Sequence, residues 1–148
     1  MIGGWKVTSV VTLASGFPLT VSAGEDTANI GNCCRPNRDF NVSTKLDNPT
    51  VDKFFNTAAY SRAPNGTFGT AGRSEIIGPG IKNWDFSLAK EFHLNTQHYV
   101  EFRFEAFNFL NRPNFGDPNT NLSNVAFGRI SSTRTDMRQL QFGLKYVF

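Results

Sequence analysis

The chain has 148 residues, a length that suits one ordinary domain. Its net charge of +3 is too small, and its basic residues are too scattered, to mark a nucleic-acid-binding surface. No apolar run approaches the roughly 18 residues of a transmembrane helix, so no such helix is expected. Aromatic residues make up 14% of the chain and stand among many Gly, Asn, Thr and Ser residues. This composition predicts an all-β chain with long loops.

The first predicted strand lies near residues 4–14, where side chains alternate between two faces. Trp5, Val7, Ser9, Val11 and Leu13 share one face, and Lys6, Thr8, Val10, Thr12 and Ala14 share the other. Strict alternation over this length favours a strand over a helix. A sheet with one dry and one wet face fits both a soluble sandwich and a membrane barrel, whose strands are apolar only at alternate positions.

Residues 22–80 are rich in Gly, Pro and Asn and show no sustained periodicity. We therefore expect little regular structure there and no independently packed hydrophobic core. Cys33 and Cys34 are adjacent, with Cα atoms about 3.8 Å apart, below the usual disulfide range, so two thiols in a surface loop are the favoured interpretation. Arg35 and Arg38 could bind an anion, although two loop arginines are usually solvated.

Three more strands are predicted near residues 82–94, 98–109 and 137–148, each with the same alternation. A tight hairpin at Asn95, Thr96 and Gln97 joins the first two, and a long turn-rich stretch separates the last two. Runs of about 10 residues match tilted strands that cross a bilayer, whereas soluble strands are usually about 5–6 residues long. The order long, short, long is that of an up-and-down barrel with its hairpin in the periplasm and its long loops outside.

One residue fits this pattern poorly, and the aromatic residues fit it well. Lys90 falls on the apolar face, where a lysine costs about 2–4 kcal/mol at the bilayer midplane, so we expect either a snorkelling side chain or a bulge near Ala89.

Aromatic rings collect near both ends of the strands, as in the girdles of barrels. They are Trp5, Tyr146 and Phe148 at the periplasmic ends and Phe17, Trp84, Phe107 and Phe109 at the outer ends.

The last strand carries a recognisable motif. The run from Gln141 to Phe148 has a polar residue, then Gly143 two positions on, then Tyr146 and Phe148 at the third and fifth positions after that glycine. It resembles the C-terminal signal of outer-membrane proteins. The resemblance implies that the barrel-assembly machinery reads this strand, chiefly through Gln141, Gly143, Tyr146 and Phe148.

A narrower resemblance covers almost the whole chain. The segments 65–73, 78–88, 102–111, 113–116 and 127–130 are similar to the outer loops and next-to-last strand of Oar-like TonB-dependent receptors. The resemblance implies the last four strands of a large, plugged barrel that takes up a substrate across the outer membrane of a Gram-negative cell. It implies as partners the outer-membrane lipid, the remaining strands and plug of the full-length protein, and TonB through N-terminal parts that this sequence lacks. The transported substrate is not implied.

Candidate site residues have competing explanations. Glu91, Glu101, Arg103 and Glu105 are candidates for a lumen wall along a substrate path. For Glu101, Arg103 and Glu105 we favour a charge ladder that keeps a wet face wet. Glu91 and His93 could also be acid–base groups, but no nucleophile or third partner stands beside them, and we do not favour this interpretation. His93 and His98 could hold a metal, yet zinc sites want three or four ligands. Gly78, Pro79 and Gly80 lack the lysine and helix of a phosphate loop.

No nucleophile and base stand together, so we expect no enzyme, no cofactor and no metal. The alternative to a transporter is a soluble or cell-surface β-sandwich that binds carbohydrate or protein. Four strands are too few to close a barrel, so we expect an open sheet with exposed edges at its first and last strands. Without detergent, such a fragment should aggregate.

Overall fold

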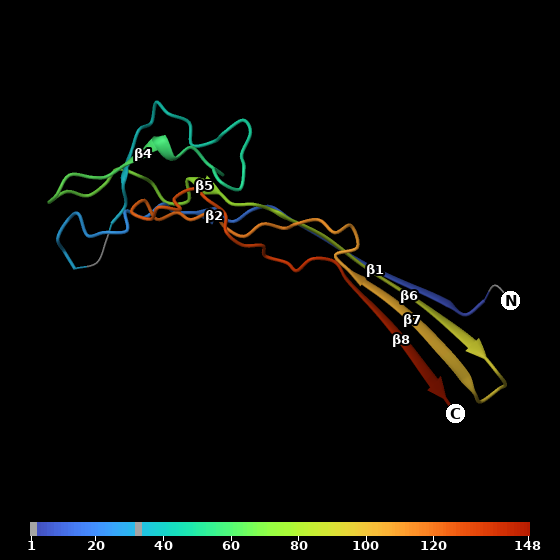
Figure 1. Ribbon diagram of the computed structural model, residues 1–148. Helices are drawn as coiled ribbons and strands as arrows, with labels where there is room; N and C mark the ends of the chain where they lie inside the picture. Colours follow the sequence, from blue (N-terminus) through green and yellow to red (C-terminus); the bar gives the residue numbers. More distant parts are fainter. Residues whose placement is uncertain (1–2, 32–33) are drawn as a thin grey trace. The chain divides into compact units, whose positions relative to one another are not determined.

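A computed structural model describes residues 3–31 and 34–148. Within these residues the chain is all-β, apart from the single 3-10 turn η1 (Thr57–Ala59). The chain forms two compact units (Figure 1). The sheet unit consists of the described part of Met1–Ala14 together with Ile81–Asn114 and Thr133–Phe148, and the loop unit consists of Ser15–Gly80 and Phe115–Ser132.

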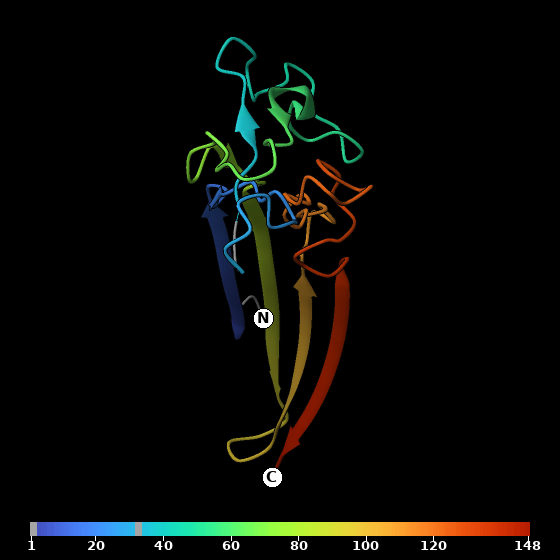
Figure 2. The ribbon, with the colours of Figure 1, turned by 90° about the vertical axis from the view of Figure 1, so that its left-hand side faces the viewer.

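The sheet unit is an antiparallel meander of four strands (Figures 1 and 2). The strands are β1 (Trp5–Ala14), β6 (Ile81–His93), β7 (Tyr99–Phe107) and β8 (Gln139–Val147), and they are hydrogen-bonded in the order β1-β6-β7-β8. Each predicted strand is confirmed, with every end within two residues of its expected place. The predicted sequence-order pairing is confirmed as well.

The register of the strands explains why the sheet has two different faces. One row across the sheet pairs Val7 with Leu88, Leu88 with Phe104 and Phe104 with Phe142. The next row pairs Thr8, Ser87, Glu105 and Gln141 in the same way. Since neighbouring residues of a strand point to opposite faces, apolar rows fall on one face and polar rows on the other.

The hairpin between β6 and β7 is held by an asparagine side chain. Oδ1 of Asn95 accepts hydrogen bonds from the backbone N–H groups of Gln97 at 2.9 Å and His98 at 2.8 Å. The backbone N–H of Leu94 donates to the His98 carbonyl at 2.9 Å. Asparagine favours turns because its short side chain bonds nearby backbone groups, and the predicted tight hairpin is confirmed.

At the opposite end of the sheet, Asn108 ends β7. Its backbone has a φ of +51°, a left-handed conformation that asparagine tolerates better than most residues and that a strand cannot continue through. The side chain is buried and its Nδ2 donates to the carbonyls of Arg112 at 3.0 Å and Asp136 at 3.1 Å. The chain leaving β7 and the chain entering β8 are therefore tied to one buried amide.

Lys90 lies on the apolar face with a continuous register on both sides, so the predicted bulge is wrong, and its side chain is buried, with 7% exposed. It pairs with Trp5 and Phe102 across the strands. Nζ donates a hydrogen bond to the Gly3 carbonyl and lies 5.2 Å from the ring centre of Trp5 and 5.6 Å from that of Phe92. The ammonium therefore reaches the end of the sheet, with aromatic faces as neighbours.

The loop unit has little regular structure, as predicted. Its strands are two residues long and form two antiparallel pairs, β2 (Pro18–Leu19) with β5 (Ile76–Ile77) and β3 (Asn37–Arg38) with β4 (Tyr60–Ser61). A hydrophobic core is nevertheless found in this unit, which the sequence did not predict. A buried cluster is present, made of Val21, Phe55, Ala59, Tyr60, Ala71 and Ile76, with Leu122 and Phe127 packed against it.

This core does not belong to residues 22–80 alone. The ring of Phe55 meets those of Phe127 at 5.2 Å and Tyr60 at 6.2 Å, both edge to face. Phe127 and Leu122 come from the second long loop, which joins β7 to β8. The core therefore joins the two long loops into one body instead of forming a separate domain within the first loop.

Two expectations for the first loop are corrected. Arg38 is not solvated, because its side chain is only 9% exposed, lies 3.6 Å from Glu75 and donates to the Val42 carbonyl at 2.7 Å. Burial and the Glu75 carboxylate raise the pKa of Tyr60, whose hydroxyl donates to Glu75 at 2.8 Å. Cys34 is disulfide-bonded and not a free thiol, and Cys33 lies outside the described residues.

Candidate functional site

The apolar face of the sheet unit is largely uncovered. Large side chains on it are far more exposed than a soluble core allows, with Val7 at 62%, Phe142 at 66% and Leu144 at 76%. These residues lie in adjacent rows of the register, so they form a continuous apolar surface. A contiguous surface of this kind in water favours association or aggregation, so the face requires a non-aqueous covering.

The polar face carries charges of both signs in the middle of the sheet. Nη2 of Arg103 lies 2.8 Å from Oε1 of Glu101, and the register places Lys145 directly opposite Glu101. Two shallow hollows of about 240 and 190 Å³ lie over this face, and Glu101, Arg103 and Glu105 line both. Lys6 from β1 lines the first hollow. Charged groups that remain open to a hollow suit a wet surface.

Glu91, the fourth candidate on this face, is set apart from the other three. It stands opposite Glu101 in the register but contacts His93, whose Nε2 lies 3.5 Å from its Oε2. Like charges placed directly opposite each other destabilise a sheet pair, and here each carboxylate has its own basic neighbour on the same strand. The structure thus brings Glu101 and Arg103 into contact and leaves Glu91 outside the hollows.

The residues of the C-terminal motif divide between the two faces. Gln141 and Gly143 lie in the polar rows, and a Cβ on Gly143 would meet only the Cβ of Arg103, at 3.8 Å. Tyr146 lies in an apolar row, where its ring centre is 6.0 Å from that of Phe148. The hydroxyl of Tyr146 is 2.9 Å from Nδ1 of His98 in the hairpin, a contact that strand alternation alone does not reveal.

The histidines have separate neighbours, Glu91 for His93 and Tyr146 for His98. Within residues 3–31 and 34–148, no group of three or more His, Cys, Asp or Glu side chains is arranged to hold a metal ion. In the same part of the chain, none of the helical structure has the length and apolar character needed to cross a membrane.

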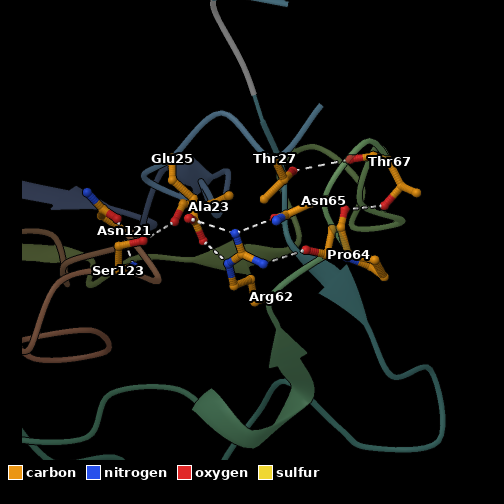
Figure 3. A network of polar contacts seen from close by, with 10 residues as sticks. Ala23, Glu25, Thr27, Arg62, Pro64, Asn65, Thr67, Asn121 and Ser123 are labelled. Carbon is orange, nitrogen blue, oxygen red and sulfur yellow. Dashed lines mark hydrogen bonds and ion pairs between the residues drawn. The ribbon is translucent and has the colours of Figure 1, made fainter. Parts of the chain in front are cut away.

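A polar network ties together three segments of the loop unit (Figure 3). Arg62 holds both carboxylate oxygens of Glu25, at 2.6 and 3.1 Å, and its Nη2 donates to Asn65 at 2.6 Å. Ser123 of the second loop donates to the Ala23 carbonyl at 2.6 Å. A parallel bridge between Ser22 and Asn121 runs beside these contacts. The network joins the two long loops by hydrogen bonds, in addition to their shared core.

Strands of nearly bilayer-crossing length, with one apolar face and one charged face, define the wall of a membrane β-barrel. The family model described as an outer membrane beta barrel domain matches residues 1–141, so the chain belongs to that family and is placed in the cell outer membrane. No curated protein and no solved structure matches the chain.

Proposed function

We propose that the chain is the C-terminal part of the barrel of an Oar-like TonB-dependent transporter, which carries a substrate across the outer membrane with energy coupling. The observation that carries this proposal is the pair of unlike faces on one sheet. The apolar rows would meet lipid, and the rows with Glu101, Arg103 and Glu105 would line the interior. The resemblance of the loop and strand segments to Oar-like receptors supplies the transporter class.

The edges of the sheet support the fragment interpretation. Among the described residues, β1 pairs only with β6 and β8 pairs only with β7. A membrane barrel leaves no open edge, and the smallest single-chain barrels have about eight strands. In this proposal, further barrel strands and the plug come from the rest of the full-length protein. TonB would act through those parts, and the barrel-assembly machinery would read β8.

The β-sandwich alternative lacks support from the sheet unit. A sandwich covers one face of each sheet with the other sheet, so its inner residues are buried. Among the described residues, the only other sheets are two pairs of two-residue strands in the loop unit, and Leu13 of the four-stranded sheet is 73% exposed.

Site-specific labelling in cells tests the proposal. Glu105→Cys and its neighbour Phe104→Cys, introduced singly into the full-length protein, place one thiol in a polar row and one in an apolar row. A membrane-impermeant maleimide should label the Glu105→Cys protein and leave the Phe104→Cys protein at the background of the parent. Labelling should also respond to energisation in cells with TonB and lose that response when TonB is deleted.

The two readouts address different parts of the proposal. Equal labelling of the two variants would contradict the barrel wall, because the rows would then share one environment. Labelling that differs between the variants but is the same with and without TonB would contradict energy coupling and leave the barrel wall intact.

A further inference from the structure

We infer that a cleft in the loop unit binds a small organic anion that carries an apolar body, such as an aromatic carboxylate. The cleft has a volume of about 530 Å³, and Arg35, Arg73, Ile30 and Phe68 are among its lining residues. All four belong to the first long loop. This ligand class would be that of the transported substrate if the proposed function holds. Binding at the cleft itself does not depend on transport.

The arginines of the loop unit separate into two groups. Arg38, Arg62 and Arg129 each contact a carboxylate, those of Glu75, Glu25 and Asp52. Arg35 and Arg73 are exposed, line the same cleft, and have no side-chain hydrogen bond or ion pair with any described residue. Two unpaired guanidinium groups at one cleft repel each other, and a bound anion would relieve that repulsion.

The carboxylate beside the cleft, that of Asp26, has no ion pair with either arginine. Oδ1 of Asp26 lies 3.7 Å from the sulfur of Cys34, another lining residue, while Oδ2 accepts a hydrogen bond from the Gly31 N–H at 2.6 Å. Its own loop therefore supplies a hydrogen bond to one oxygen of the Asp26 carboxylate. The charge that the cleft presents to a ligand comes from the two guanidinium groups.

The apolar part of the cleft lining determines that the uncharged part of the ligand is apolar. Ile30 is 60% exposed and Phe68 is 67% exposed, so both leave apolar surface open to a guest. Ligand sites combine an apolar lining with a few polar groups that fix orientation. A carboxylate between the arginines, with its ring or chain against Phe68 and Ile30, uses both features.

The backbone that presents these side chains is fixed before a ligand arrives. The N–H of Ala71 donates to the Pro36 carbonyl at 3.0 Å, and that of Arg38 donates to Oγ1 of Thr70 at 3.0 Å. Gly69 is required there, since a Cβ on it would lie 2.0 Å from the Arg35 carbonyl oxygen. A preformed arrangement lowers the conformational cost of binding.

The test measures binding of a defined probe to the whole chain in non-ionic detergent micelles. Fluorine NMR line broadening of 4-fluorobenzoate reports its affinity, with empty micelles as the blank and the uncharged 4-fluorobenzamide as the matched probe. The variants are Arg35→Gln and Arg73→Gln, and the control is Arg112→Gln, an exposed arginine that does not line the cleft.

We expect the carboxylate to bind and the amide not to bind. Arg35→Gln and Arg73→Gln should each weaken the carboxylate about tenfold or more, since each removes a charged hydrogen-bond donor, and Arg112→Gln should leave it unchanged. Equal binding of the amide, or unchanged affinity in both cleft variants, would overturn the inference. Displacement by inorganic phosphate at the same concentration would overturn the apolar part of the ligand class.

Transport plays no part in this measurement. If maleimide labelling shows no dependence on TonB while the cleft variants lose the probe, the proposed function fails and the binding site stands. If labelling depends on TonB and the probe does not bind, the site fails alone.

Discussion

Replacing Phe55 by alanine tests whether the loop core holds the two long loops together. Phe55 is 2% exposed and contacts the rings of Tyr60 and Phe127 edge to face. Removing a buried phenylalanine side chain costs about 3–5 kcal/mol, and we expect the lower end here because Phe127 is only partly buried and can relax. A loss of about 3 kcal/mol raises the population of the opened loop unit roughly 100-fold.

Hydrogen exchange measures that population directly. The N–H groups of Phe54 and Asn56 donate to the Gly128 and Thr44 carbonyls, each at 2.8 Å, so they exchange only when the core opens. Their exchange should be about 100-fold faster in Phe55→Ala, measured by mass spectrometry on the chain in non-ionic detergent. The matched control is Phe68→Ala, since Phe68 is 67% exposed. Exchange rates that are alike in the two variants would show that the buried ring does not stabilise the loop unit.

The remaining predictions concern one lysine and one tyrosine. Lys90→Ala should lower the free energy of unfolding in detergent by about 2 kcal/mol or more, because it removes a charged hydrogen bond and two cation–π contacts. The control is Lys82→Ala, which changes an exposed lysine on the same strand. Equal urea midpoints for the two variants would contradict the role of Lys90. Burial and Glu75 raise the pKa of Tyr60, so the folded loop unit keeps a proton that the unfolded chain loses above about pH 10. The stability that this group contributes is complete below that pH and falls as the pH rises. Tyr60→Phe should make the stability of the loop unit depend less steeply on pH in the alkaline range, as measured by near-ultraviolet circular dichroism. The same alkaline profile in the variant and the parent would refute this prediction.

The sheet could be predicted from the sequence because its information is local. Alternation in residues 98–109 places Phe102 and Phe104 on one face and Glu101 and Arg103 on the other, whatever the partner strand. The hairpin was predictable for the same reason, since Asn95 bonds only residues two and three positions along the chain. The faces of the candidate residues followed, although their roles remain proposals.

The loop core could not be predicted, because its contacts join residues with no local pattern. Phe55 and Phe127 lie in different loops, and neither stands in a periodic run that marks a buried position. Arg38 looked like any loop arginine, and only the fold brings Glu75 and Tyr60 to it. The contact of Tyr146 with His98 was missed because it depends on the exact register of β8 against the hairpin.

The bridge between Ser22 and Asn121 determines how another molecule can recognise the loop unit. These residues are far apart in the sequence, yet Ser22 donates to the Thr120 carbonyl at 3.0 Å and accepts from Leu122 at 2.9 Å. The surface around them exists only while both loops are folded together. An antibody raised against it would see a discontinuous epitope, and a synthetic peptide copied from either loop alone would not compete for that antibody.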